Sequence, residues 1–248
     1  MYYDIVKAGS EVPNEIGHRF ERYATELLRA LLRSHSLQPS YKYHYSGNQI
    51  DTPDIFIKKD GEVLFAVECK SKKMTFEAKF AEFPIEEEKI GYDEISKGVF
   101  QIWRFFSHYR RGLIPRLEVR LDAVGIVLTL DTWLQMSVPL REEVMAAAKV
   151  LADRPGQEII EEDRRPVVFC SIDDLERVLG FASESKFVDA VQAAATPKYL
   201  GWILPNVHRD LSGERIGNHY PFAEQLREVL PWLKGMNGFD SGAPAAQI

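Results

Sequence analysis

A short stretch around residue 60 constrains the fold of this chain more than any other. Two mainly apolar segments, 54–58 and 62–70, flank Lys59-Asp60-Gly61. An Asp-Gly pair between two such segments is typical of a tight β-hairpin. The sequence therefore predicts two antiparallel strands joined by a turn.

The second strand of this hairpin is expected to end in charged residues. Because side chains alternate between the two faces of a sheet, one face should carry four apolar residues: Val63, Phe65, Val67 and Cys69. The other face should change from apolar to charged along the strand: Leu64, Ala66, Glu68 and Lys70. Glu68 and Lys70 would then project side by side from the end of a buried strand, where Asp54 on the partner strand can approach them.

This grouping favours a metal site. Burying Asp54 close to Glu68 costs several kcal/mol unless a cation or a proton compensates. Hard oxygen ligands and the scarcity of histidines indicate Mg²⁺ or Mn²⁺. Lys70 would lie beside a metal-bound water, as metal-assisted phosphodiester hydrolysis requires. The alternative is a hairpin at the sheet edge with solvated charges and a surface ion pair between Glu68 and Lys70.

The motifs Pro53-Asp54 and Glu68-Cys69-Lys70 resemble the signature of the PD-(D/E)xK nuclease superfamily, which has the restriction-endonuclease-like fold. The resemblance implies that Asp54 and Glu68 bind the metal, together with the main-chain carbonyl of Cys69. It also implies that Lys70 positions the attacking water. The resemblance covers roughly the first half of the chain.

A helix is predicted over 15–33, with Asn14 as its cap and apolar residues at helical spacing. Glu21 lies at the edge of the apolar face, and a solvated position is the simplest interpretation. Gly17, Phe20 and Glu21 nevertheless resemble the first-helix motif of several superfamily members, which implies that Glu21 supports the metal site.

A second long helix is predicted over 92–111, ending at Gly112. Gln101 resembles the glutamine that points back to the metal in several branches of the superfamily, although an ordinary helix surface explains it equally well. Arg104, on the same polar stripe, is a candidate phosphate contact. Lys72 and Lys73, in the basic segment after the hairpin, are further candidates for nucleic-acid binding.

Further elements follow from periodicity and turn signals. Strands are expected over 41–46, 119–130 and 166–170, and helices over 141–152, 171–179, 185–195 and 222–234. A long loop or short strands are expected over 197–221. Asp51 is expected to serve a turn rather than a metal.

The predicted fold class is α/β, with a mixed central sheet flanked by helices. Up to residue 130 the expected order is helix, strand, strand, strand, helix, strand, which is the core order of the nuclease superfamily. We expect a nuclease-like core over 1–131, a packed and mainly helical extension over 132–234, and a flexible tail over 235–248.

The composition of the whole chain is that of an ordinary globular protein. The chain has 248 residues and a net charge of −6. This negative charge argues against a protein that coats nucleic acid non-specifically, although local positive charge still decides binding at a site. Cys69 and Cys170 look like core residues in a reducing compartment. No signal peptide or membrane span is recognisable, so a cytoplasmic location without membrane contact is expected.

The sequence thus predicts a metal-dependent nuclease that cuts DNA in repair, restriction or defence against foreign DNA. RNA is a possible substrate, and the resemblance implies that a homodimer is possible. The alternative is a non-catalytic module on the same fold that binds nucleic acid or protein.

Overall fold

The structure is a computed structural model that describes residues 11–133, 138–212 and 216–229. Its centre is a five-stranded sheet in the order β1-β4-β5-β6-β7. The strands are β1 (Ser36–Pro39), β4 (Ile55–Lys59), β5 (Glu62–Lys70), β6 (Glu118–Thr129) and β7 (Val167–Ser171). β1, β4 and β5 are antiparallel neighbours, whereas β5, β6 and β7 run parallel. The expected α/β class with a mixed sheet is confirmed.

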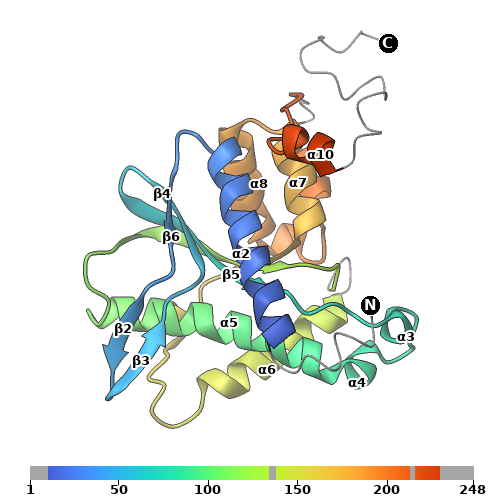
Figure 1. Ribbon diagram of the computed structural model, residues 1–248. Coiled ribbons are helices and arrows are strands. Elements are labelled where there is room, and N and C mark those ends of the chain that lie inside the picture. The colour runs from blue at the N-terminus through green and yellow to red at the C-terminus, as the bar shows by residue number, and fades with distance from the viewer. Residues whose placement is uncertain (1–10, 134–137, 213–215, 230–248) are drawn as a thin grey trace.

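Helices cover both faces of the sheet (Figure 1). One face packs against α2 (Glu11–Leu31), α7 (Ile172–Phe181), α8 (Glu184–Ala194) and α9 (Leu204–Ser212). The opposite face packs against α5 (Lys89–Arg110) and α6 (Val138–Ala152). Three short helices lie outside these layers: α3 (Phe76–Lys79), α4 (Pro84–Glu87) and α10 (Ala223–Val229).

Each face of the sheet has its own apolar core. Phe65 of β5 packs with the α2-side cluster and makes an edge-to-face contact with Phe187 at 6.3 Å between ring centroids. Ala66, the next residue of β5, belongs to the α5-side cluster. Because each fully buried large apolar side chain contributes about 1.5–3 kcal/mol, the two clusters hold β5 in place from both sides.

The predicted hairpin is confirmed. Asp60 and Gly61 both have positive φ, at 54° and 88°, which is the conformation of the tight turn that an Asp-Gly pair favours. The β4–β5 ladder pairs Ile55 with Val67 and Lys59 with Glu62.

The predicted faces of β5 are correct only beyond a β-bulge. The register shifts between Val63 and Phe65, so that Leu64 is an extra residue without a partner. Val63 therefore lies in the α5-side core and Leu64 in the α2-side core, opposite to the prediction. An inserted residue reverses the alternation before it, whereas the residues from Phe65 onward keep their predicted sides.

The strand predicted over 41–46 is not part of the main sheet. β2 (Lys42–Tyr45) pairs instead with β3 (Asn48–Asp51) in a separate ribbon, and the outer strand of the sheet is β1. The turn between β2 and β3 has positive φ at Ser46 and Gly47, so the chain folds back on itself before it can reach β4. The expected order up to residue 130 is therefore wrong in its first strand: the elements of the main sheet and its long helices follow the order α2, β1, β4, β5, α5, β6, and β1 takes the place expected for 41–46.

The second half of the chain joins the same sheet, because β7 extends it beside β6. The loop prediction over 197–221 is wrong in part, since α9 forms within it and buries Leu204 and Val207. The predicted end of the last helix and the predicted tail lie outside the described residues. Among the helices that the structure describes, none is both long enough and apolar enough to cross a membrane.

Candidate active site

The hairpin brings Asp54 next to Glu68. Asp54 comes directly before β4, and the pairing of Ile55 with Val67 places it opposite Glu68 in the ladder. Its Oδ2 accepts a hydrogen bond of 2.7 Å from the main-chain N–H of Cys69. This bond ties the start of β4 to the charged end of β5, as the sequence suggested.

Glu68 is a buried carboxylate with one unsatisfied oxygen. Its side chain lies on the α5 side of the sheet and the residue is 3% exposed. Oε1 accepts a hydrogen bond of 3.0 Å from the Nζ of Lys70, whereas Oε2 is buried and has no hydrogen-bond partner among the described residues. Leaving a charged oxygen in this state costs at least about 1–3 kcal/mol, so the site favours a cation or a proton at Oε2.

Lys70 is held between two elements. Its Nζ donates to Glu68 and also to the Oε1 of Gln101 on α5, at 2.8 Å. Gln101 therefore lies at the site, as the resemblance implied. Two acceptors from a strand and a helix fix the ammonium group more firmly than a surface ion pair would.

The close approach of α5 to this point depends on Gly98, which sequence analysis missed. A Cβ at Gly98 would lie 3.0 Å from the Cε of Lys70 and 3.5 Å from the Cγ of Glu68. Glycine inside a helix is unfavourable by about 1 kcal/mol relative to alanine, so its presence one turn before Gln101 was a usable signal of close packing.

The electrostatics of the site favour a bound proton when no cation is present. Burial, and then the charge of Glu68, raise the pKa of Asp54 from 3.8 to about 8. Burial also raises the pKa of Glu68, against the opposing effect of Lys70. Burial alone would lower the pKa of Lys70, but the charge and hydrogen bond of Glu68, with the charges of Asp54 and Glu94, together outweigh it, so the pKa is raised. Lys70 therefore stays protonated, and a proton resides on Asp54.

Glu21 lies near the site but not in it. α2 crosses the end of β5, where a Cβ at Gly17 would lie 3.6 Å from the Oγ of Ser71. The charge of Glu21 contributes to the raised pKa values of Asp54 and Glu68. Its carboxylate lies 3.8 Å from the Nδ1 of His18, and it acts on Asp54 and Glu68 through its charge.

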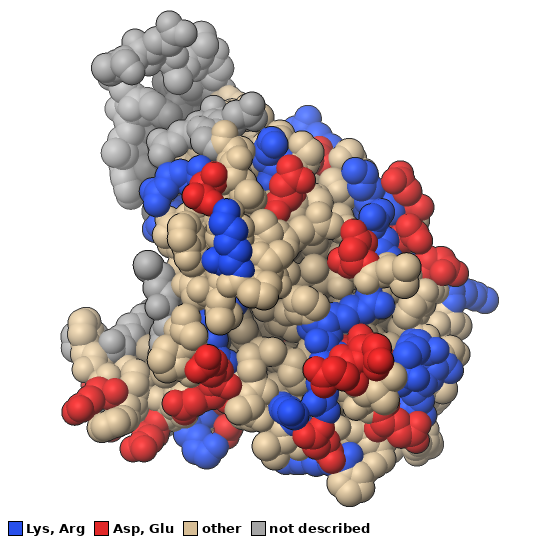
Figure 2. Space-filling view, turned by 180° about the vertical axis from the view of Figure 1, so that it is seen from behind, with Lys and Arg blue, Asp and Glu red and all other residues tan. Residues whose placement is uncertain are grey.

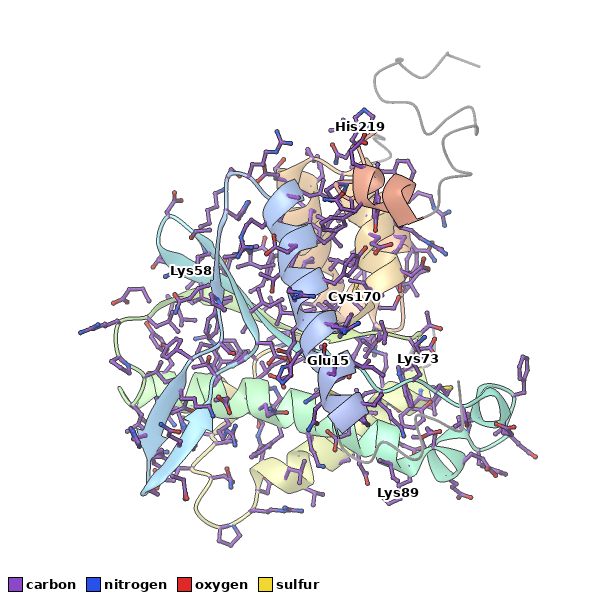
Figure 3. All side chains as sticks on the ribbon, viewed as in Figure 1. Glu15, Lys58, Lys73, Lys89, Cys170 and His219 are labelled. Carbon is purple, nitrogen blue, oxygen red and sulfur yellow. The ribbon has the colours of Figure 1, made fainter. Side chains whose placement is uncertain are left out.

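The predicted nucleic-acid contacts lie around this centre. Arg104 is one turn beyond Gln101, its guanidinium lies 5.5 Å from the centre of the Phe100 ring, and its charge lowers the pKa of Glu68. The Nζ of Lys72 lies 3.5 Å from Glu88, so its charge is partly compensated. Lys73 is exposed on the segment that follows β5 (Figure 3). On the face in Figure 2, positive and negative side chains are interspersed.

Oxygen donors at this centre fit a hard divalent cation. Asp54 and Glu68 supply two carboxylates, and the main-chain carbonyl of Cys69 lies between Glu68 and Lys70 in sequence. The described residues include no group of three or more His, Cys, Asp or Glu side chains arranged to hold a metal. A metal would therefore complete its shell with main-chain oxygen, water or a phosphate of the substrate, as Mg²⁺ commonly does.

Comparison of this chain with models of known protein families, with curated proteins and with solved structures finds no match in any of the three.

Proposed function

We propose that this protein is a metal-dependent nuclease with a restriction-endonuclease-like core, and that its substrate is DNA. One observation carries the proposal: Asp54 lies opposite the buried Glu68, whose Oε2 has no hydrogen-bond partner among the described residues, and both lie beside a lysine fixed by Gln101. The order α2, β1, β4, β5, α5, β6 supports the same assignment.

In this proposal Asp54, Glu68 and the main-chain carbonyl of Cys69 would hold Mg²⁺ or Mn²⁺. The metal supplies charge neutralisation and a water molecule with a lowered pKa. Lys70, which stays protonated, acts as a hydrogen-bond donor that orients the water or stabilises the phosphoryl oxygens, and it does not remove the proton. Gln101 keeps Lys70 in position, and Glu21 adds negative charge that strengthens cation binding.

The proposed substrate reaches the centre from the side of Arg104, Lys72 and Lys73. These residues would contact phosphates and position the strand without reading its sequence. A homodimer would allow cleavage of both strands. We further propose a cytoplasmic role in repair, restriction or defence against foreign DNA, which suits the free thiols of Cys69 and Cys170. A non-catalytic module that binds nucleic acid or protein is the second candidate, and the net charge of −6 suits a protein partner.

A cleavage assay tests the proposal. Supercoiled, linear and single-stranded DNA, and RNA, are incubated with Mg²⁺, Mn²⁺ or EDTA. Glu68→Gln and Lys70→Met should reduce metal-dependent cleavage by at least about 100-fold, while circular dichroism stays unchanged. Glu62→Gln, an exposed position at the other end of β5, is the matched control and should cleave like the wild type. Cleavage of none of these substrates by the wild type would favour the binding module.

A further inference from the structure

Arg141 on α6 is a buried arginine that has no counter-ion among the described residues. The residue is 6% exposed, and its Nε is buried without a hydrogen-bond partner in the same part of the chain. In the part of the chain that the structure describes, no carboxylate forms an ion pair with Arg141. Its guanidinium lies 5.1 Å from the centre of the Phe169 ring. Burying an unpaired charge costs several kcal/mol, so a bound anion would stabilise this side chain.

Arg141 lines a small cavity at the carboxyl ends of two parallel strands. Thr129 ends β6 and Ser171 ends β7, and both line the cavity with Thr132, Trp133 and Trp202. Ligands of open α/β sheets bind at this edge. The space open to the centres of water molecules is about 20 Å³, and one water needs roughly 10–15 Å³ by this measure. One or two oxygen atoms of an oxyanion can therefore enter, whereas a nucleoside cannot.

The first turn of α7 borders the same cavity. Ser171 is the N-cap of this helix, and its side chain accepts a hydrogen bond from the main-chain N–H of Asp174. The positive end of a helix dipole favours an anion. The opposing charge in the cavity is the buried carboxylate of Asp174, whose Oδ2 accepts a hydrogen bond from the Oγ of Ser171 at 2.9 Å.

The cavity lies on the same sheet edge as the candidate active site. In the parallel ladder Lys70 pairs with Thr129, and Thr129 pairs with Ser171. Two strand spacings of about 4.8 Å separate Lys70 from Ser171, so one end of a nucleic-acid strand can reach both. Trp202, which is 43% exposed, offers a surface on which a base can stack.

We propose that the cavity beside Arg141 binds a phosphate monoester, carried by the end of a nucleic-acid strand whose following phosphodiester groups pass Asp54 and Glu68. The second half of this proposal rests on the proposed nuclease function. A diester is flanked by chain on both sides, so a small cavity that opens to the surface suits a terminal phosphate better than an internal one.

The first arm of the test measures phosphate alone. Thermal unfolding is followed in EDTA with and without inorganic phosphate, so that cleavage plays no part. Phosphate should raise the Tm of the wild type and leave that of Arg141→Met unchanged. Arg165→Met removes a different guanidinium, stacked on Phe106 near the start of β7, and should keep the response. An equal response in wild type and Arg141→Met, or none in either, would overturn the site.

The second arm identifies the source of the phosphate. In the Glu68→Gln background, whose cavity is intact, binding of oligonucleotides with 5′-phosphate, 3′-phosphate or hydroxyl ends is compared by fluorescence polarisation in EDTA. One phosphorylated end should bind about tenfold tighter than the hydroxyl form, and Arg141→Met should abolish the difference. Equal binding of all three, together with a response to inorganic phosphate, would overturn the strand-end assignment and establish a site for free phosphate. Neither arm depends on cleavage, so a failure here is distinct from a failure of the nuclease proposal.

Discussion

The carboxyl group of Asp54 gives the proposed metal site a quantitative test. Its pKa is about 8 in the folded, metal-free protein, against 3.8 as the ordinary value. Between these two values the folded state holds a proton that the unfolded chain has released. The free energy of unfolding therefore falls as the pH rises through this window, by about 1.4 kcal/mol per pH unit, and the contribution is constant outside it.

Asp54→Asn removes this effect, because an amide cannot ionise and its oxygen can still accept the hydrogen bond from Cys69. Three pH units above the ordinary pKa, near pH 7, the variant should be more stable than the wild type by about 4 kcal/mol. Near pH 4 the two proteins should be equally stable. The expected gain is the opposite of what the loss of an ordinary ion-paired aspartate would produce.

Urea unfolding in EDTA, at several values between pH 4 and pH 8, measures this difference. Asp51→Asn, at the exposed end of β3, is the matched control and should show no such dependence on pH. Adding Mg²⁺ near pH 7.5 should reduce the difference in the free energy of unfolding between Asp54→Asn and the wild type, because the cation stabilises only the protein that carries both carboxylates. If Asp54→Asn and the wild type are equally stable at pH 7, or if the difference between their free energies of unfolding does not change with pH, the reasoning is refuted.

Three further substitutions test the contacts that α5 makes along its length. Gly98→Ala should displace Lys70 and lower cleavage at least about tenfold while the helix stays intact. The control is Gly180→Ala, where a Cβ meets nothing within 4 Å, and its activity should be that of the wild type. Equal cleavage by the two variants would contradict the close packing of α5 on Lys70. Gln101→Leu should lower the rate of cleavage more than DNA affinity, because it frees Lys70 without removing a phosphate contact; an effect on affinity alone in binding and single-turnover assays would contradict this role. Asp163→Ala removes the carboxylate that accepts two hydrogen bonds from Arg110 and one from the main-chain N–H of Ile160. This variant should lose about 2 kcal/mol of stability in urea unfolding, and a loss below about 0.5 kcal/mol would show that these bonds contribute little.

The parts of the structure that the sequence predicted depend on local patterns. The hairpin around Asp60 and Gly61 follows from turn chemistry and alternation, and these two signals also place Asp54 opposite Glu68. Helical spacing predicts the long amphipathic helix that carries Gln101, whereas its role at the site was implied by the resemblance. In each case the information lies within a few residues of the side chain concerned.

The parts that were missed depend on tertiary contacts. β1 carries one apolar residue that packs on the core, Leu37, and ends in proline, so only its pairing with β4 makes it a strand. The sequence gives no sign of the bulge at Leu64, because residues 63–67 are all apolar. α9 forms in a segment rich in residues that favour turns, because Leu204 and Val207 reach the core. The burial of Arg141 depends on Phe169 of β7, a strand that α6 separates in sequence from its partner strand β6.

The central claim is that Asp54 and Glu68 together bind a divalent metal. Calorimetric titration with Mn²⁺ near pH 8 tests it without knowledge of the substrate. The account predicts binding to the wild type that both Asp54→Asn and Glu68→Gln abolish, whereas Asp51→Asn retains it. No binding to the wild type, or equal binding to all four proteins, would contradict the account.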